Sequence, residues 1–120
     1  MKTGMKNIKR INILSVANSA ILFDYVKVGE LNDHELNVVQ VENRTLDFHT
    51  HSDSDELFYI IEGEMKLEFE KQIIDLKEGD FAVVPKGVLH RPICTSLVKL
   101  LLIEKKGTLS KKNTGGTYTG

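Results

Sequence analysis

Four side chains that can ligate a metal ion occur at a spacing that lets them converge. His49 and His51 are two residues apart on a predicted strand, so both imidazoles point to one face, because successive strand side chains alternate. Glu56 follows after a short polar loop, and His90 opens a later strand beyond a Pro-Lys-Gly turn at 85–87. Three imidazoles and one carboxylate suit one divalent transition metal ion: Fe, Mn, Ni, Cu or Zn. Such a set leaves an octahedral ion two open positions for a chelating substrate, water or dioxygen.

The segments that must position these ligands are short strands separated by turn residues. No segment after residue 24 has room for a crossover helix, so a parallel sheet is excluded and the pattern is typical of an all-β sandwich or barrel. The predicted strands are 25–30, 35–42, 46–51, 56–62, 64–71, 72–76, 81–85, 90–94 and 97–105.

The spacing around the ligands resembles the two motifs of the cupin family. The first family motif reads G-x5-H-x-H-x(3,4)-E-x6-G, and this chain follows it from Asn43 to Gly63. The second reads G-x5-P-x-G-x2-H-x3-N, and this chain follows it from Gly79 to Cys94. The resemblance covers residues 43–94 and is closest to small single-domain bacterial cupins of unassigned function. It implies a double-stranded β-helix, or jelly-roll barrel, with a metal held by His49, His51, Glu56 and His90.

Two positions depart from the family motifs. Asn43 replaces the first glycine, and we expect its turn to survive because asparagine tolerates the left-handed region better than most residues. Cys94 replaces the final asparagine. It shares parity with His90 and therefore faces the interior, either as an inert buried side chain or as a thiol near the metal.

Strand alternation predicts which side chains surround the site. If Glu56 points inward, the apolar side chains at the next alternate positions of its strand do so as well. Together with the following strand they predict an apolar pocket lined by Phe58, Ile60, Met65, Leu67 and Cys94.

The strand that begins at Glu56 is also apolar on its outward face. Leu57, Tyr59 and Ile61 would face water unless something covers them, and strand 97–105 has the same two-sided character. A second copy of the chain is the expected cover, and the cupin resemblance also implies a homodimer. The alternative is cover by the N-terminal helix.

The chain divides into three parts around one domain. Residues 1–24 are a helical lead-in, 25–106 form the β-barrel, and 107–120 are a flexible C-terminal tail with four of the nine glycines. As an alternative, the tail drapes over a neighbour through Leu109 and Tyr118. The apolar face expected for the helix comprises Ile13, Leu14, Val16, Ala17, Ala20 and Ile21.

Composition limits the partners and the compartment. Sixteen basic residues balance 17 acidic ones without a basic stripe, which argues against nucleic acid and against an anionic membrane surface. No apolar run reaches the ~18–20 residues that span a bilayer. The N-terminal segment is a poor match to a signal peptide, and the single cysteine cannot form an internal disulfide, so we expect a cytoplasmic protein.

These features favour a metal-dependent enzyme that acts on a small organic molecule. An apolar pocket beside a redox-active ion suits dioxygenase-like chemistry. A sugar-phosphate isomerase-like enzyme is an alternative, but it needs basic residues at the mouth, for which Arg44, Lys86 and Arg91 are the candidates. A small-molecule or metal sensor without turnover, or a purely structural metal site, is the other alternative. No residue is assigned as catalytic.

Overall fold

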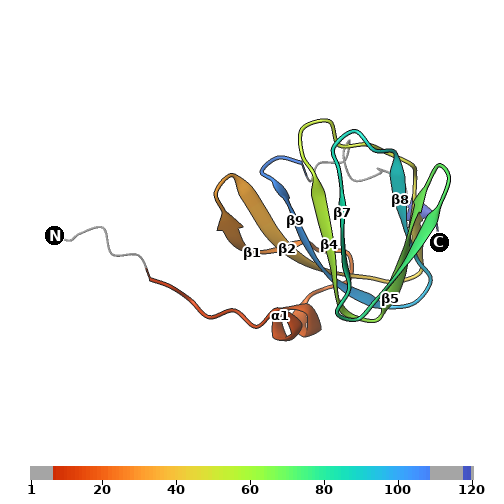
Figure 1. The fold of residues 1–120 in the computed structure, drawn as a ribbon. Coiled ribbons are helices and arrows are strands. Elements are labelled where there is room, and N and C mark those ends of the chain that lie inside the picture. The colour runs from red at the N-terminus through yellow and green to blue at the C-terminus, as the bar shows by residue number, and fades with distance from the viewer. Residues whose placement is uncertain (1–6, 109–117, 120) are drawn as a thin grey trace.

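The computed structural model describes residues 7–108 and 118–119 (Figure 1). Within these residues, one short helix precedes a series of antiparallel strands, as expected from the short segments and their turns. The elements are α1 (Ile13–Ser19), β1 (Val26–Leu31), β2 (His34–Val41), β3 (Arg44–Leu46), β4 (Glu56–Glu62), β5 (Glu64–Phe69), β6 (Ile73–Lys77), β7 (Phe81–Val84), β8 (His90–Cys94), β9 (Val98–Lys105) and β10 (Tyr118–Thr119).

The strands form two five-stranded sheets that enclose the core. The first sheet has the order β1-β2-β9-β4-β7 and the second has the order β10-β3-β8-β5-β6. Figure 1 shows the two sheets curving toward each other, with β4 and β7 passing in front of β9. This all-β architecture is a double-stranded β-helix, which confirms the predicted fold.

Alternation along the strands sets the interior of the barrel. In β4 and β9 every second side chain is buried, from Glu56 to Ile60 and from Val98 to Glu104. The inward parity predicted for four apolar residues is correct, because Phe58, Ile60, Met65 and Leu67 are all buried. Strand parity was therefore a reliable guide to which face each side chain occupies.

The turn at the end of β2 confirms the expectation for Asn43, whose φ is 54°. Asparagine adopts this left-handed conformation at little cost, so it replaces the motif glycine without disturbing the turn. Gly63, between β4 and β5, has less latitude. Its φ is +93°, and a Cβ there would lie 2.5 Å from the Leu97 carbonyl oxygen. A side chain at residue 63 would clash with backbone that cannot move aside.

The predicted strand 46–51 is wrong beyond its first residue. β3 ends at Leu46, and only His49 makes a further bridge, with His90. Beyond Leu46 the Asp47 carbonyl accepts from the His49 side chain, and the His51 carbonyl accepts from the Gly87 amide of the turn instead of from a sheet partner. The two ligand histidines therefore lie on an irregular segment.

The predicted apolar face of the helix is correct in part. Ala17 is buried and Ile13, Val16 and Ala20 are partly buried, whereas Leu14 is 38% exposed and Ile21 is 72% exposed. The Gln40 side-chain amide donates to the backbone carbonyls of Ala17 and Ala20, and it fixes the helix by its C-terminal end. The helix ends at Ser19, so Ile21 lies beyond it.

The C-terminal segment is described only in part. Residues 109–117 and 120 lie outside the described residues, and so does the proposed Leu109 contact. Tyr118 and Thr119 form β10, which pairs with Leu46 and Thr45 of β3 in the same chain. In the part of the chain that the structure describes, no helix has the length and apolarity needed to cross a membrane.

Candidate metal centre

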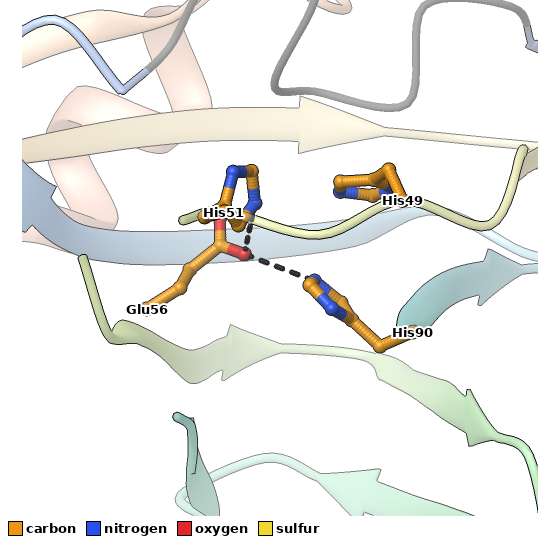
Figure 2. Close-up of side chains that lie close together, drawn as sticks. All are labelled: His49, His51, Glu56 and His90. Atoms are coloured by element: carbon orange, nitrogen blue, oxygen red, sulfur yellow. Dashed lines mark hydrogen bonds and ion pairs between the residues drawn. The ribbon is translucent and has the colours of Figure 1, made fainter. Parts of the chain in front are cut away.

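The four predicted ligands meet at one end of the barrel (Figure 2). His49 and His51 come from the irregular segment after β3, Glu56 is the first residue of β4, and His90 is the first residue of β8. One ligand atom from each side chain can be chosen so that all four lie within 4.8 Å of one another. Three elements remote in sequence thus supply one compact cluster.

The separations within the cluster fit a first-row ion. Glu56 Oε1 lies 3.0 Å from His51 Nε2 and 3.3 Å from His90 Nε2. Adjacent ligands of an octahedral ion are about 3.0 Å apart, and opposite ligands about 4.2 Å, when each bond is about 2.1 Å long. The donor set and its spacing are therefore compatible with one metal ion, and they leave its identity open among first-row metals.

Backbone carbonyls orient two of the imidazoles. His49 Nδ1 lies 2.9 Å from the Asp47 carbonyl oxygen, and His90 Nδ1 lies 2.8 Å from that of Val88. A carbonyl can only accept, so each Nδ1 carries the proton and each Nε2 keeps a free lone pair for a metal. Nδ1 of His51 is buried and has no hydrogen-bond partner in residues 7–108 or 118–119.

Backbone hydrogen bonds hold the ligand-bearing segments together. His49 and His90 donate to each other's carbonyl oxygens, both at 3.0 Å. The Gly87 amide donates to the His51 carbonyl at 2.8 Å, and the Lys86 amide donates to Asp55 Oδ1 at 2.8 Å. The Pro-Lys-Gly turn is thus joined directly to the loop that carries the first histidines.

Burial and mutual contact set the charge states of the cluster. Burial by itself raises the pKa of Glu56, but the contacts with His51 and His90 outweigh it and lower that pKa to about 2. Burial lowers the pKa of His49. An ionised carboxylate beside a neutral imidazole is the form in which both groups bind a metal.

Glu104 is a buried carboxyl that sequence reasoning missed. It is 1% exposed and lies on β9 next to the Leu102–Phe58 and Ile103–Leu57 pairs, which places it across from Glu56. Neither of its oxygens has a hydrogen-bond partner among the described residues. Burial, and then the charge of Glu56, raises its pKa to about 10. The alternation of β9 could have revealed the burial of Glu104, since Glu104 shares the inward parity of Val98, Leu100 and Leu102.

A small apolar cavity of about 30 Å³ lies beneath the ligands. His49 and Glu56 form part of its wall, and the predicted pocket residues Phe58 and Cys94 line it as well. Cys94 is 2% exposed, and burial raises the pKa of its thiol to about 12, so the thiol stays protonated.

Three predicted pocket residues do not line this cavity. Ile60, Met65 and Leu67 are buried without contributing to its walls, because parity fixes the face of a strand but not which inward residues border a cavity. In β5 the residue that pairs with His90 is Phe69, whose ring centroid lies 6.4 Å from that of His90. Phe69 was not predicted from the sequence as a neighbour of the ligand cluster, although this residue shares the inward parity of Met65 and Leu67.

Comparison with known proteins agrees with this fold and cluster. The Cupin domain family matches residues 37–104. The uncharacterized protein YdbB of Bacillus subtilis is 38% identical over 85 residues, which cover 69% of this chain and 74% of that protein. A cupin-2 domain containing protein from Shewanella frigidimarina has a structure with a TM-score of 0.74 and 32% identity, covering 80% of this chain and 94% of that one.

A more distant relative has a named activity. The 3-hydroxyanthranilate 3,4-dioxygenase of Bacillus thuringiensis is 38% identical over 69 residues, which cover 53% of this chain and only 38% of that enzyme. Fold and cluster together define a double-stranded β-helix with a metal-compatible centre of histidines and glutamate. The chain belongs to the cupin family, as the two motifs indicated.

Proposed function

We propose that this protein binds one divalent transition metal ion and is a dioxygenase-like enzyme that acts on a small organic substrate. The observation that carries the proposal is the convergence of His49, His51, Glu56 and His90 above an apolar cavity. Similarity to 3-hydroxyanthranilate 3,4-dioxygenase over part of its length supports an electron-rich aromatic or enolic substrate. In such a reaction both atoms of dioxygen enter the product, so no external reductant is required.

The chain's own residues give the site three properties. Neutral imidazoles and one carboxylate hold the ion, and the ion supplies the redox chemistry when it is bound. Glu56 offsets part of the ion's charge, and the net positive charge that remains favours an anionic ligand such as a phenolate or enolate. His51, Glu56 and His90 are almost fully buried and His49 is only partly buried, so the approach of a substrate is from the His49 side.

The test combines metal analysis with oxygen uptake. Protein purified without chelator is assayed for metal and then for oxygen consumption with small phenols, 3-hydroxyanthranilate, flavonols and diketones. We expect about one ion per chain and oxygen uptake with one of these substrate classes, and we expect His49→Ala to abolish both. His34→Ala is the matched control, because His34 is a partly exposed histidine on β2 paired with Asp33. Metal without any oxygen uptake would remove the enzymatic part of the proposal.

A metal-binding or sensing module without turnover is the second candidate, and the size of the cavity favours it. About 30 Å³ is far below the roughly 300–1,000 Å³ typical of small-molecule sites. An organic substrate would therefore have to bind outside the cavity, next to His49. Metal binding with ligand-induced stabilisation, but without oxygen uptake, would support this candidate over the enzyme.

The isomerase alternative has less support because two of its three basic candidates, Arg44 and Arg91, are engaged elsewhere. The Arg91 guanidinium donates to Glu68 at 2.7 and 2.8 Å and lies over the Phe48 ring. The Arg44 guanidinium lies 4.4 Å from the centroid of the Phe23 ring. Neither is poised to hold a phosphate at the ligand cluster.

We also propose that two copies form a homodimer, in the cytoplasm, through the outer face of the first sheet. Cross-strand pairing aligns two apolar rows on this face, Phe81–Tyr59–Leu101 and Val83–Leu57–Ile103–Leu36. Val38 continues the first row but is already buried within the chain. Phe81 is 60% exposed and Val83 is 50% exposed in the single chain. Large contiguous apolar surfaces of this kind mark interaction sites.

The alternative cover for this face is α1. It lies beside a more polar cross-strand pair, Gln40 and Lys99. Lys99 Nζ donates to Asn18 at 2.6 Å, and Gln40 donates to the helix carbonyls, so both polar side chains are used to fix the helix. Light scattering coupled to gel filtration tests the dimer. We expect Phe81→Glu to give a monomer and Ile73→Glu, at an exposed apolar residue of β6, to leave the mass unchanged.

A further inference from the structure

The cavity below the metal ligands has walls of unusually uniform chemistry. It lies one layer deeper than the cluster, because Phe58 is two residues beyond Glu56 on β4 and Cys94 is four residues beyond His90 on β8. Another wall comes from the adjacent strands β2 and β9, where Val39 and Val41 lie beside Leu100 and Leu102 in one sheet.

Its polarity is concentrated at one end. His49 and Glu56 form the wall that faces the ion, and away from them the lining side chains are hydrocarbon except for the Cys94 thiol and the Tyr25 hydroxyl. A buried water needs about two to four polar partners. The imidazole and carboxylate atoms that would serve such a water are the ones that face the metal ion, so the deeper part of the cavity is a poor site for water.

Its size selects the class of molecule that fits. About 30 Å³ exceeds the roughly 10–15 Å³ minimum for one water-sized sphere, and it falls an order of magnitude short of an organic ligand site. A diatomic or monatomic apolar species fits both the volume and the hydrocarbon walls.

We propose that this cavity is a holding site for a small apolar gas molecule beside the metal centre, and that the gas is dioxygen. The identity of the gas rests on the proposed function, whereas the existence of the site does not. A molecule held there is adjacent to His49 and Glu56, and most of the remaining wall consists of buried apolar side chains. The site therefore supplies the reaction centre with the gas from a side that the organic substrate does not occupy.

Xenon tests the site without relying on activity. Methyl signals of zinc-loaded protein are followed by NMR as xenon pressure rises, because dry apolar cavities bind xenon. We expect saturable shifts at Val41, Leu100 and Leu102, with linear and small changes at methyl groups elsewhere. Val39→Ile adds one methylene group at the cavity wall, and Val98→Ile makes the same change at a buried residue that does not line the cavity.

The expected result is that Val39→Ile abolishes the saturable shifts and Val98→Ile retains them. The proposal is overturned if the unmodified protein shows no saturable shift, if Val39→Ile leaves the shifts intact, or if both substitutions remove them. Val41→Ile is a second cavity-filling variant, for use if Val39→Ile does not fold.

Oxygen kinetics then separates the gas site from the enzymatic proposal. With an active substrate, Val39→Ile raises the KM for dioxygen while the KM for the organic substrate is unchanged. Xenon binding without oxygen uptake for any substrate would leave the cavity in place and reject the enzyme and dioxygen as its ligand. Oxygen uptake without xenon binding would support the enzyme and reject the cavity as a gas-holding site.

Discussion

The barrel interior contains two buried layers that differ in chemistry but hardly in exposure. The ligand layer, which we define as His51, Glu56, His90 and Glu104, is between 0 and 4% exposed. The apolar layer, defined as Ile60, Met65 and Leu67, is also between 0 and 4% exposed. Burial therefore does not distinguish the site from the core. The distinguishing property is that, among residues 7–108 and 118–119, the ligand layer holds polar atoms that lack hydrogen-bond donors until a proton or an ion is bound, including both Glu104 oxygens.

The two layers also contribute differently to stability. Removing hydrocarbon from water stabilises the fold in any solution condition, since burial of the apolar layer involves no proton and no ion. Burying a polar atom without a hydrogen bond costs free energy, so the ligand layer weakens the fold until an ion or a proton satisfies it. The ligand layer should therefore respond to metal and pH, and the apolar layer should not.

The largest effect is expected from truncation in the apolar layer. Ile60→Ala should lower the free energy of unfolding by about 2–5 kcal/mol, because it removes buried methyl groups and leaves a cavity. Urea denaturation should give the same loss for metal-loaded and metal-stripped protein. Ile73→Ala, at an exposed residue, is the control, with a change of about 0.5 kcal/mol or less. A loss that depended on metal would contradict the separation of the layers.

Metal removal should give the next largest effect, and only through the ligand layer. An ion present at about 1,000 times its dissociation constant stabilises the folded state by about 4 kcal/mol, so chelation should lower Tm measurably. His49→Ala should abolish the difference between chelated and metal-loaded samples, whereas Ile60→Ala should preserve it. Scanning calorimetry provides the measurement. An unchanged Tm on chelation of metal-containing protein would mean that the cluster does not hold the ion.

The pH dependence of the metal-free protein should report on Glu104. Its pKa is raised to about 10 from 4.5, so the folded state keeps a proton that the unfolded state releases, and stability falls as pH rises between these values. We test pH 7–9, above the ordinary titration of histidine, where the slope for one proton is at most about 1.4 kcal/mol per pH unit. Glu104→Gln should flatten the dependence. A steep fall that persists in Glu104→Gln would assign it to another group.

The smallest effect is expected from substitutions at two turn glycines that share the same left-handed backbone conformation. Gly79 and Gly87 have φ of +89° and +82°, and neither has an atom within 4 Å of an added Cβ. Alanine at either should cost about 1–2 kcal/mol. Only the Gly87 amide bonds to His51, so only Gly87→Ala should weaken metal affinity, by about tenfold or more, as measured by competition with a chelator. Equal metal affinities in the two variants would show that the turn does not position the ligand.

Sequence reasoning predicted the elements that depend on local pattern. Strand alternation gave the inward side chains of β4 and β5, and the motif spacing brought together His49, His51, Glu56 and His90. The left-handed turn at Asn43 followed from the glycine that the family motif has at this position and from the tolerance of asparagine for that conformation. Each of these properties is set by residues near in sequence or by a spacing that the fold repeats.

The remaining features depend on contacts that no local pattern records. The strand expected at 46–51 ends at Leu46, and the later backbone bonds to the remote residues Gly87 and His90. The helix end is anchored by Gln40, which lies 20 residues further along the chain than Ala20. Phe58 lines the cavity and Ile60 does not, although both point inward. Which inward residues reach the cavity depends on the register between strands. Glu104 was predictable from the parity of β9, but only once its strand was followed to its end.

The paired backbone hydrogen bonds between His49 and His90 have a consequence for how the ion comes and goes. They join two ligands 41 positions apart through atoms that the ion does not touch. The frame therefore persists when the centre is vacated, and exchange of one ion for another does not require the barrel to open. In a mixture of metals such a preassembled frame fills according to supply and intrinsic ligand preference, which rises from manganese to copper. The ion that each molecule holds then depends on the metal ions in its surroundings and not on which ion was present when the chain folded.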